Sequence, residues 1–265
     1  MKNLTEFILK LGIDRLGFCK AGDFNAVVML FPYYSGRDEK GNISFYTYSE
    51  DYHITVKKYL DKVAAFIKSL GEYKAEVYVD VSPYNDVELA YNAGLGVVGK
   101  NKLLINDKYG SLCFIGYVIT DMPLEESAPV NGGCLNCNKC VKSCPTGALR
   151  NYDFSICLSE ITQKKSELTE IEKQTIKENG SAFGCDICQI VCPMNNFKIT
   201  KIAEFKNNLV TYIKKSDFEN LSNKEFKEKY GNRAFSWRGK KVLIRNLEIL
   251  EDQERLSEEG PGGKI

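Results

Sequence analysis

The sequence predicts an α/β domain over residues 1–125, a cysteine-rich segment with little regular structure over residues 126–200, and a short helical segment over residues 201–265. Three observations lead to this division. Helical and strand signals alternate in the first part, eight cysteines lie between residues 134 and 192, and a Lys- and Glu-rich sequence with a helical apolar period closes the chain. At 265 residues the chain is long enough for two domains.

Each regular element is predicted from its apolar spacing. A helix is expected over residues 4–11, where Leu4, Ile8 and Leu11 share one face, and a second over about residues 51–70. Runs of β-branched residues predict strands, and turn residues at 106–110 join the last two of them. The predicted strands comprise residues 76–81, 103–105 and 112–119 after an apolar run at residues 26–31, and further helices are expected near residues 166–179 and 242–250.

The composition is that of an ordinary globular protein. Hydrophobic residues make up 43% and charged residues 27% of the chain, and the net charge is +1. This balance argues against a strongly basic, generic nucleic-acid-binding protein, although it is compatible with a local basic patch. No apolar stretch approaches the roughly 20 residues that a membrane helix needs, and no signal-peptide pattern opens the chain. We therefore expect a cytoplasmic protein with reduced thiols and no membrane partner.

The clustered cysteines predict two [4Fe-4S] clusters. They read Cys134-x2-Cys137-x2-Cys140-x3-Cys144-Pro145, then Cys157, then Cys185-x2-Cys188-x3-Cys192-Pro193. Two cubane clusters need eight thiolates, and this spacing closed by proline is the ligation pattern of bacterial ferredoxins. The competing interpretations are structural zinc and disulfides. Zinc sites rarely use this run, and disulfides are typical of secreted chains, so we expect iron–sulfur clusters and electron transfer.

The same spacing assigns a ligand set to each cluster. In such a motif the last cysteine, which precedes proline, binds the other cluster. Cys157 takes the place of the cysteine that would open the second motif. The first set is Cys134, Cys137, Cys140 and Cys192, and the second is Cys144, Cys157, Cys185 and Cys188. The remaining cysteines, Cys19 and Cys113, lie in apolar sequence and are expected to be buried free thiols.

Several motifs occur in one order along the chain. In the first part they are Phe31-Pro32-Tyr33-Tyr34, Asp51-Tyr52-His53, Val79-Asp80-Val81-Ser82-Pro83, Ala93-Gly94-Leu95-Gly96-Val97-Val98-Gly99-Lys100-Asn101 and Tyr109-Gly110-Ser111. The cysteine segment adds Cys144-Pro145-Thr146-Gly147-Ala148 and Phe183-Gly184-Cys185-Asp186-Ile187-Cys188-Gln189. Together they resemble the epoxyqueuosine reductase family over about residues 5–197. A fainter likeness at residues 240–250 lies where family members begin a tail of helical repeats.

The resemblance implies a fold and an activity. Members of the family use cobalamin and two [4Fe-4S] clusters to remove the epoxide oxygen from epoxyqueuosine in tRNA. The implied fold is an α/β cobalamin-binding domain, an α+β sandwich of nitroreductase-like type, followed by a ferredoxin-like double [4Fe-4S] domain and a short helical tail. The expected partners are tRNA and a low-potential electron donor of the flavodoxin or ferredoxin type.

The resemblance also implies the residues of the site. Loss of the oxygen as water consumes two electrons and protons, so a general acid is needed beside the cobalt centre. Asp80 is the candidate, and a carboxyl group at the end of a buried strand beside a corrin is expected to have a raised pKa. The alternative is that Asp80 only caps the turn before Pro83. The candidate cobalamin contacts are His53, Ser82, Gly99, Lys100, Asn101, Leu104, Gly110 and Ser111.

Some of these positions have a second interpretation. His53 is the only histidine, and simple packing on a helix face competes with a contact to the cofactor. Gly94-x-Gly96-x-x-Gly99 also spells a dinucleotide-binding fingerprint, but the acidic residue expected after it is not evident. We expect its glycines to allow close approach of the backbone to a corrin instead. Trp237 lies in basic sequence, and it either contacts RNA or packs beside solvated charges.

The chain departs from the family pattern in features that concern the substrate. Val87, Val97 and Glu50 stand where members commonly have an arginine, an aromatic residue and a basic residue. We also expect most of the helical repeat tail to be absent. Three functions therefore stay open. They are a short epoxyqueuosine reductase, a cobalamin-dependent reductase of another small substrate, and a [4Fe-4S] electron-transfer protein without catalytic cobalt.

Overall fold

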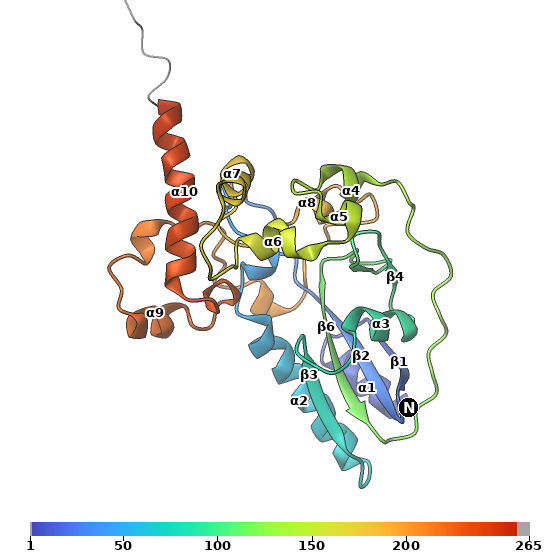
Figure 1. Ribbon diagram of the computed structural model, residues 1–265. Coiled ribbons are helices and arrows are strands. Elements are labelled where there is room, and N and C mark those ends of the chain that lie inside the picture. Colours follow the sequence, from blue (N-terminus) through green and yellow to red (C-terminus); the bar gives the residue numbers. More distant parts are fainter. Residues whose placement is uncertain (1, 259–265) are drawn as a thin grey trace, which may run out of the picture. The chain divides into compact units, whose positions relative to one another are not determined.

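The computed structural model describes residues 2–258, and the side chains of residues 2–251 (Figure 1). These residues form two compact units that are interleaved along the sequence. Unit 1 lies within residues 1–36, 49–138 and 192–208, and unit 2 lies within residues 37–48, 139–191 and 209–265. The division differs from the consecutive zones predicted at residues 1–125, 126–200 and 201–265, because the chain returns to unit 1 at Cys192.

Unit 1 is a mixed α/β structure built around a four-stranded sheet. The strand order is β1-β2-β6-β3, and every neighbouring pair is antiparallel. β4 and β5 pair separately as a short ribbon. The elements are α1 (Lys2–Lys10), β1 (Leu16–Ala21), β2 (Phe24–Pro32), α2 (Tyr52–Ser69), β3 (Ala75–Val79), α3 (Asp86–Asn92), β4 (Val97–Val98), β5 (Leu104–Ile105), β6 (Cys113–Thr120) and a 3₁₀ turn at Ala203–Phe205.

Helices cover both faces of the sheet (Figure 1). On one face, Ala26 and Val28 of β2 share a buried cluster with Leu89 of α3. On the other face, a Cβ added to Gly116 of β6 would lie 2.6 Å from Cγ1 of Val56 in α2. Because alternate residues of a strand point to opposite faces, the apolar residues of β2 serve both helical layers. This explains why β2 is a nearly continuous apolar run.

Most of the regular elements predicted from the sequence are confirmed. The structure contains the helices and strands expected at residues 4–11, 51–70, 76–81, 103–105, 112–119, 166–179 and 242–250, and the apolar run at residues 26–31 lies within β2. β1 and α3 have no counterpart in the prediction. β1 is a six-residue strand that contains glycine and lysine, and α3 has only seven residues, so neither shows an extended apolar period.

Unit 2 consists of short helices and irregular backbone around the cysteine motifs, followed by longer helices. α4 packs against α8, and α10 packs against α7, where Ile249 and Leu250 contact a cluster that includes Leu168 and Ile176. The helices are α4 (Lys139–Ser143), α5 (Ala148–Asn151), α6 (Leu158–Ile161), α7 (Glu170–Asn179), α8 (Ile187–Ile190), α9 (Asn223–Tyr230) and α10 (Lys240–Glu258), with 3₁₀ turns at Phe45–Thr47, Phe154–Ile156, Lys215–Asp217 and Ala234–Ser236. Within residues 2–258, no helix combines the length and the apolarity needed to cross a membrane.

Residues 192–208 complete unit 1 from far along the chain. Asn195 is buried and its Oδ1 accepts a hydrogen bond from the backbone N–H of Ser111, which precedes β6. Phe205 is fully buried, and its ring centroid lies 5.4 Å from that of Phe114 in β6. These contacts are the physical reason for the interleaved division of the chain, since the segment fills positions that the first 125 residues leave open.

Candidate active site and cluster ligands

Asp80 directly follows β3 and is held by the first turn of α2. Its backbone φ is 64°, in the left-handed region, which aspartate adopts more readily than most residues. Its Oδ2 accepts a hydrogen bond of 2.9 Å from the Tyr52 hydroxyl and lies 3.5 Å from Nε2 of His53. The structure therefore brings together two residues that the sequence singled out, Asp80 and His53.

His53 lies between two carboxylates. Its Nδ1 is 2.9 Å from Oδ1 of Asp51, and its Nε2 faces Asp80. Asp51 also caps α2, because its carboxylate accepts the backbone N–H of His53 at 2.9 Å. The hydrogen bond to Asp51, and then the one to Asp80, raise the pKa of His53 to about 9, although burial acts in the opposite direction.

The pKa of Asp80 is lowered, so the prediction of a raised value is wrong. The hydrogen bond from His53 is the largest cause, and the hydrogen bond from Tyr52 adds to it, while burial opposes both. The side chain of Asp80 is 59% exposed, so burial does not dominate. At neutral pH Asp80 is therefore ionised and His53 holds the proton that the two side chains share.

Ser82 belongs to a second hydrogen-bonded group in the loop that follows Asp80. Its hydroxyl contacts the hydroxyl of Tyr117, which donates to Oδ1 of Asp86 at 2.7 Å. The backbone N–H of Tyr84 also donates to Ser82 Oγ at 2.9 Å. Burial raises the pKa of Asp86, and the hydrogen bond from Tyr117 opposes it. These contacts give Ser82 a role in shaping the loop, and its contact with a cofactor stays a prediction.

The glycine motif packs against the protein itself. A Cβ on Gly96 would lie 2.5 Å from the carbonyl oxygen of Ile105, and one on Gly99 would overlap Oδ1 of Asn101. These glycines thus allow the segments around β4 and β5 to approach closely. Leu104 is only 6% exposed and belongs to the hydrophobic core, which accounts for its conformation without a ligand. The approach of a corrin to this motif stays a prediction.

Asn101 carries a buried donor that no neighbour satisfies. Asn101 is 5% exposed, and its Oδ1 accepts a hydrogen bond from the backbone N–H of Leu103 at 3.4 Å. Its Nδ2 has no hydrogen-bond partner among the residues that the structure describes. Leaving a buried donor unpaired costs free energy, and such groups commonly have a ligand, ion or water as partner. Asn101 therefore suits an amide or phosphate oxygen of a bound group. Beside it, Lys100 Nζ donates to Oδ1 of Asn138 at 2.7 Å.

Gly110 and Ser111 are clamped by Asn195. Oδ1 of Asn195 accepts the backbone N–H of Ser111 at 2.6 Å, and a Cβ on Gly110, which has a φ of +63°, would overlap that oxygen. The backbone N–H of Asn195 in turn donates to the carbonyl of Cys192 at 3.1 Å. Within unit 1, the end of the second cysteine motif is therefore fixed directly against the predicted cofactor loop.

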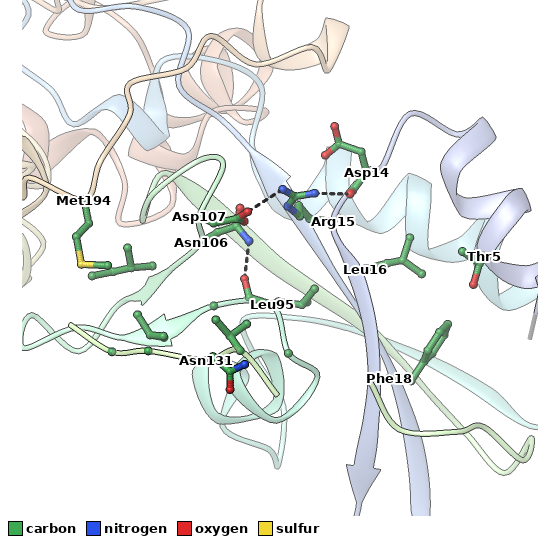
Figure 2. Close-up of a pocket in the computed structure, with 17 residues that line it drawn as sticks. Thr5, Asp14, Arg15, Leu16, Phe18, Leu95, Asn106, Asp107, Asn131 and Met194 are labelled. Atoms are coloured by element: carbon green, nitrogen blue, oxygen red, sulfur yellow. Dashed lines mark hydrogen bonds and ion pairs between the residues drawn. The ribbon is translucent and has the colours of Figure 1, made fainter. Parts of the chain in front are cut away.

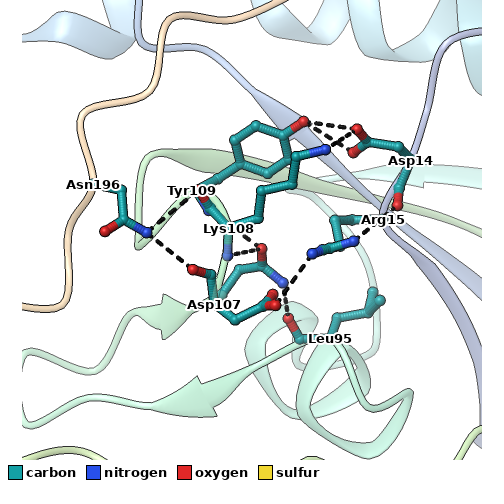
Figure 3. Close-up of polar contacts among 8 residues, drawn as sticks. Asp14, Arg15, Leu95, Asp107, Lys108, Tyr109 and Asn196 are labelled. Carbon is teal, nitrogen blue, oxygen red and sulfur yellow. Dashed lines mark hydrogen bonds and ion pairs between the residues drawn. The ribbon is translucent and has the colours of Figure 1, made fainter.

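Charged residues hold the turn that precedes this loop (Figure 3). Lys108 forms an ion pair with Asp14, the Tyr109 hydroxyl donates to the same carboxylate at 2.9 Å, and Arg15 pairs with Asp107 at 3.2 Å. Burial alone would raise the pKa of Asp14, but the hydrogen bonds from Lys108 and Tyr109 outweigh it and lower the pKa. The turn is thus fixed to the residues just before β1.

A cavity of about 680 Å³ lies beside the same turn (Figure 2). Leu95, Asn106, Asn131 and Met194 are among the residues that line it, and Asn106 Nδ2 donates to the carbonyl of Leu95 at 2.5 Å. Gly94 and Gly96 of the glycine motif line this cavity, whereas Asp80 and His53 do not. It is therefore distinct from the Asp80 site.

Three thiols of the second ligand set lie close together in unit 2. Burial is the largest cause that raises the pKa of Cys185, to about 12, and the nearby charges of Cys157 and Cys144 add to it. Burial likewise raises the pKa of Cys157, and the charge of Cys144 contributes. Neighbouring thiolates repel one another, so a group that carries positive iron charge suits such a site. These pKa shifts concern Cys144, Cys157 and Cys185, and the second ligand set stays a prediction.

Backbone N–H groups surround the sulfur of Cys144. Burial would raise its pKa, but hydrogen bonds from the backbone of Leu149, Thr146 and Gly147, together with the Thr146 side chain, lower the pKa overall. Hydrogen bonds to a thiolate sulfur stabilise its negative charge and tune the potential of a bound cluster. The Cys-Pro-Thr-Gly-Ala sequence thus has a local reason to form this loop.

The first ligand set is divided between the units, with Cys140 in unit 2 and Cys134, Cys137 and Cys192 in unit 1. Among the described residues, no three His, Cys, Asp or Glu side chains are grouped so as to hold a metal ion. The four thiolates that hold a [4Fe-4S] cluster surround a group of eight atoms, so they lie farther apart than the ligands of a single metal ion. The ligand sets stay predictions. Cys19 is buried as expected, whereas Cys113 is only partly buried.

Four side chains with roles in these sites were missed by sequence reasoning. Asp51 contacts His53, and Tyr52 donates a hydrogen bond to Asp80. The sequence could have indicated both roles, because the two residues precede His53 in one motif and aspartate is a typical helix cap. Asn195 gives no local signal. Asp186, between two cysteine ligands, is buried and accepts hydrogen bonds from Ser44 Oγ at 2.6 Å and the backbone of residue 45 at 2.8 Å. Burial raises the pKa of Asp186 to about 6.

Comparison with known proteins defines the class of this chain. Residues 133–195 match a family model described as a 4Fe-4S double cluster binding domain. The protein is therefore an iron–sulfur protein in which a double-cluster domain is combined with a mixed α/β unit. Residues 23–81, which end just after Asp80, match a second model described as epoxyqueuosine reductase QueG, DUF1730.

Similarity to whole proteins gives the family. The epoxyqueuosine reductase of Lactococcus garvieae (strain Lg2) is 39% identical over 215 residues, which cover 78% of this chain and 60% of the relative. That of Cyclobacterium marinum is 34% identical over 249 residues, which cover 88% of this chain and 77% of the relative. A crystal structure of epoxyqueuosine reductase with a tRNA-Tyr epoxyqueuosine-modified stem loop has a TM-score of 0.82 and 26% identity, over 95% of this chain and 80% of that chain.

The chain belongs to the epoxyqueuosine reductase family. It spans 60% of the length of the Lactococcus relative and 54% of the length of a Listeria monocytogenes relative.

Proposed function

We propose that this protein is a reductase that converts epoxyqueuosine to queuosine in tRNA. The observation that carries the proposal is the Asp51–His53–Asp80 arrangement, which stores a proton beside a half-exposed carboxylate. This arrangement lies within the segment that matches the epoxyqueuosine reductase model, and the same chain has a double-cluster domain. Relatives are named epoxyqueuosine reductases, and one solved structure of that name includes a modified tRNA stem loop.

The reaction needs electrons and protons. The epoxide oxygen leaves as water, which consumes two electrons and two protons and leaves a carbon–carbon double bond. When bound, the two clusters supply single electrons and cobalamin supplies the cobalt centre. Asn101, with its unpaired amide donor, and the loop of Gly110 and Ser111 are the residues that we expect to hold cobalamin. A flavodoxin- or ferredoxin-type donor is the expected source of electrons.

We assign proton delivery to the His53–Asp80 pair. With a pKa of about 9, His53 is protonated at neutral pH, and its Nε2–H faces Oδ2 of Asp80. The first proton moves from His53 Nε2 to Asp80 Oδ2, and Asp80 passes it to the departing oxygen. His53 then takes up a proton from solvent, and the pair delivers this second proton in the same way. Asp51 keeps the imidazole in place through Nδ1, and Tyr52 orients the carboxylate of Asp80.

The finer description of the fold belongs to the same proposal. An antiparallel sheet between helical layers supports a nitroreductase-like α+β cobalamin domain for unit 1. Short helices separated by irregular backbone support a ferredoxin-like arrangement of the cysteine motifs. The eight ligands are assigned as the spacing predicts, with Cys144, Cys157, Cys185 and Cys188 around one cluster.

Queuosine formation tests the proposal. Anaerobically purified protein is mixed with cobalamin, a low-potential reductant and tRNA that contains epoxyqueuosine, and the digested tRNA is measured by mass spectrometry. Asp80→Asn should lower the single-turnover rate by about 10²–10⁴-fold, the range for a lost general acid. Asp61→Asn is the matched control, because Asp61 lies on α2 in an exposed ion pair with Lys57. It should keep the wild-type rate.

Other outcomes of these measurements would favour one of the two alternative functions. Intact clusters with no affinity for any cobalamin would favour an electron-transfer protein without cobalt. Cobalamin binding without queuosine formation would favour a reductase of another small substrate. An Asp80→Asn protein that is active but less stable would refute the role of Asp80 in proton delivery and leave it a role in the turn before Pro83.

A further inference from the structure

A pocket of about 520 Å³ in unit 2 is lined by charge of one sign. The loop after α6, the helix α9 and the turn that leads into α10 form it, and we call it the basic pocket. Its charged lining residues are all basic: Lys165, Lys227, Arg238, Lys240 and Lys241. The net charge of the whole chain is only +1, so this concentration is a local property of the fold.

Trp237 lines the basic pocket and is 58% exposed. The guanidinium carbon of Arg238 lies 3.6 Å from the centroid of its ring, and the indole N–H donates to Oε1 of Gln163 at 2.9 Å. These two contacts fix the ring while most of it stays accessible. A tryptophan that served only packing would be buried, so exposure argues against the packing interpretation of Trp237.

An aromatic cluster lies behind Phe226, which lines the basic pocket. Phe218, Phe226, Tyr230 and Phe235 form an aromatic cluster with ring centroids 5.1–6.0 Å apart, and Phe235 lies fully buried two positions before Trp237. A ligand would therefore meet a preformed surface rather than one that must be ordered on binding, which lowers the entropic cost.

The cations of the basic pocket are not all engaged by the protein. Lys240 Nζ contacts the carbonyl of Leu221, whereas Lys165, Lys227 and Lys241 are exposed and form no ion pair with any described residue. Nε of Arg238 is buried and has no acceptor within the described part of the chain. An anionic oxygen in the pocket would supply that acceptor.

The start of α10 adds to the positive electrostatic potential of the basic pocket. The helix begins at Lys240 beside the pocket, and its first turn contains no acidic residue. The backbone N–H groups of a first helical turn carry partial positive charge, which favours an anion at that end.

We propose that the basic pocket binds RNA, with the phosphate backbone at the lysines and an unpaired base against Trp237. A free phosphate would use the cations but gives no reason for an exposed, fixed indole. RNA with an unstacked base uses both features, because aromatic side chains stack on bases while cations contact phosphates. The inference rests on the proposed function in one respect, namely that the natural RNA is the substrate tRNA.

Fluorescence anisotropy with a labelled, unmodified tRNA anticodon stem loop tests the inference on the full chain with its clusters. Lys227→Gln and Lys241→Gln should each weaken binding and reduce the slope of log K against log salt by about 0.7, the value for one phosphate contact on a single strand. Lys224→Gln is the matched control, since Lys224 is an exposed residue of α9 outside the pocket. Affinity and slope should not change in this control.

Trp237 is tested by a second pair of variants. Trp237→Leu should weaken binding by at least about fivefold, the lower end of the effect of removing one stacked base, with little change in the salt slope. Trp237→Phe keeps an aromatic ring and should retain most of the affinity. Melting temperature and iron content on the same preparations show whether each variant is folded and loaded.

The outcomes separate this inference from the proposed function, because anisotropy measures binding without turnover. A wild-type protein that forms no queuosine, yet binds the stem loop through Lys227, Lys241 and Trp237, would support the inference alone. Wild-type affinity in all three variants would overturn it. Binding of polyglutamate with the same dependence on Trp237 would also overturn it, since the pocket would then recognise acidic protein segments.

Discussion

The proton held by His53 provides a direct test of the site. The chain has one histidine, so protein labelled with ¹³C in the imidazole ring gives a single set of ring signals that needs no assignment. The contacts raise the pKa of His53 from 6.5 to about 9. This rise of about 2.5 pH units corresponds to about 3.4 kcal/mol at 1.36 kcal/mol per unit, which is an upper limit. Because the imidazole is 44% exposed, solvent screening reduces the contribution to stability to about 1–2 kcal/mol.

Asp51→Asn is the sharper perturbation, because the hydrogen bond to Asp51 is the largest cause of the raised pKa. Asparagine is also a good helix cap, so α2 should still begin at residue 52 while the pKa of His53 falls toward 6.5. Asp80→Asn removes the second cause and should lower the pKa by less. Asp61→Asn, on the exposed face of α2, should leave the His53 signal unchanged.

The effect on stability has a defined sign. Because the folded pKa of His53 exceeds the unfolded value, its stabilising contribution is complete below about pH 6.5 and is lost as the pH rises through about 9. Urea denaturation of the wild type and of Asp51→Asn should therefore differ most near pH 6 and converge by about pH 10. A wild-type His53 signal that titrates near pH 6.5 would refute the reasoning, and so would a difference in stability that grows as the pH rises.

Iron content tests the cluster ligands: wild-type protein purified without oxygen should bind about eight irons, Cys157→Ser about four and Cys19→Ser about eight. An unchanged count in Cys157→Ser would remove that residue from the ligand set. Gly116→Ala should lower the free energy of unfolding by about 1–3 kcal/mol, since its Cβ would lie 2.6 Å from Val56 Cγ1, and a wild-type urea midpoint would show that α2 shifts freely. The single-turnover rate should decline as the pH rises through about 9, where His53 loses its proton, and a decline centred near pH 6 would contradict this assignment.

The sequence predicted those elements whose apolar period is long enough to read. α2 spans 18 residues with buried positions at helical spacing, and β6 spans eight residues of largely apolar sequence. β1 is defined mainly by its pairing with β2, which is a long-range property that no local period encodes. The interleaving of the two units could not be predicted from the sequence either, because it depends on the long-range contacts of residues 192–208.

The same distinction applies to the site. The cysteine spacing is local and predicted a double-cluster domain, which the family comparison confirms. The contact between His53 and Asp80 joins α2 to the end of β3, and only the fold creates it. The raised pKa expected for Asp80 came from burial alone, and the sign reversed because a protonated imidazole lies 3.5 Å away. Motif order identified the residues, whereas the direction of proton sharing required their geometry.

The return of residues 192–208 to unit 1 has a consequence for biosynthesis. A ribosome releases the strands of the sheet long before Asn195 and Phe205, so the nascent α/β unit lacks the amide that clamps Ser111 and the ring that packs on Phe114. Unit 1 therefore cannot complete its fold until all eight ligand cysteines have been synthesised. The loop at Gly110 then becomes fixed only in a chain that already carries its electron-transfer segment, which couples maturation of the two sites in time.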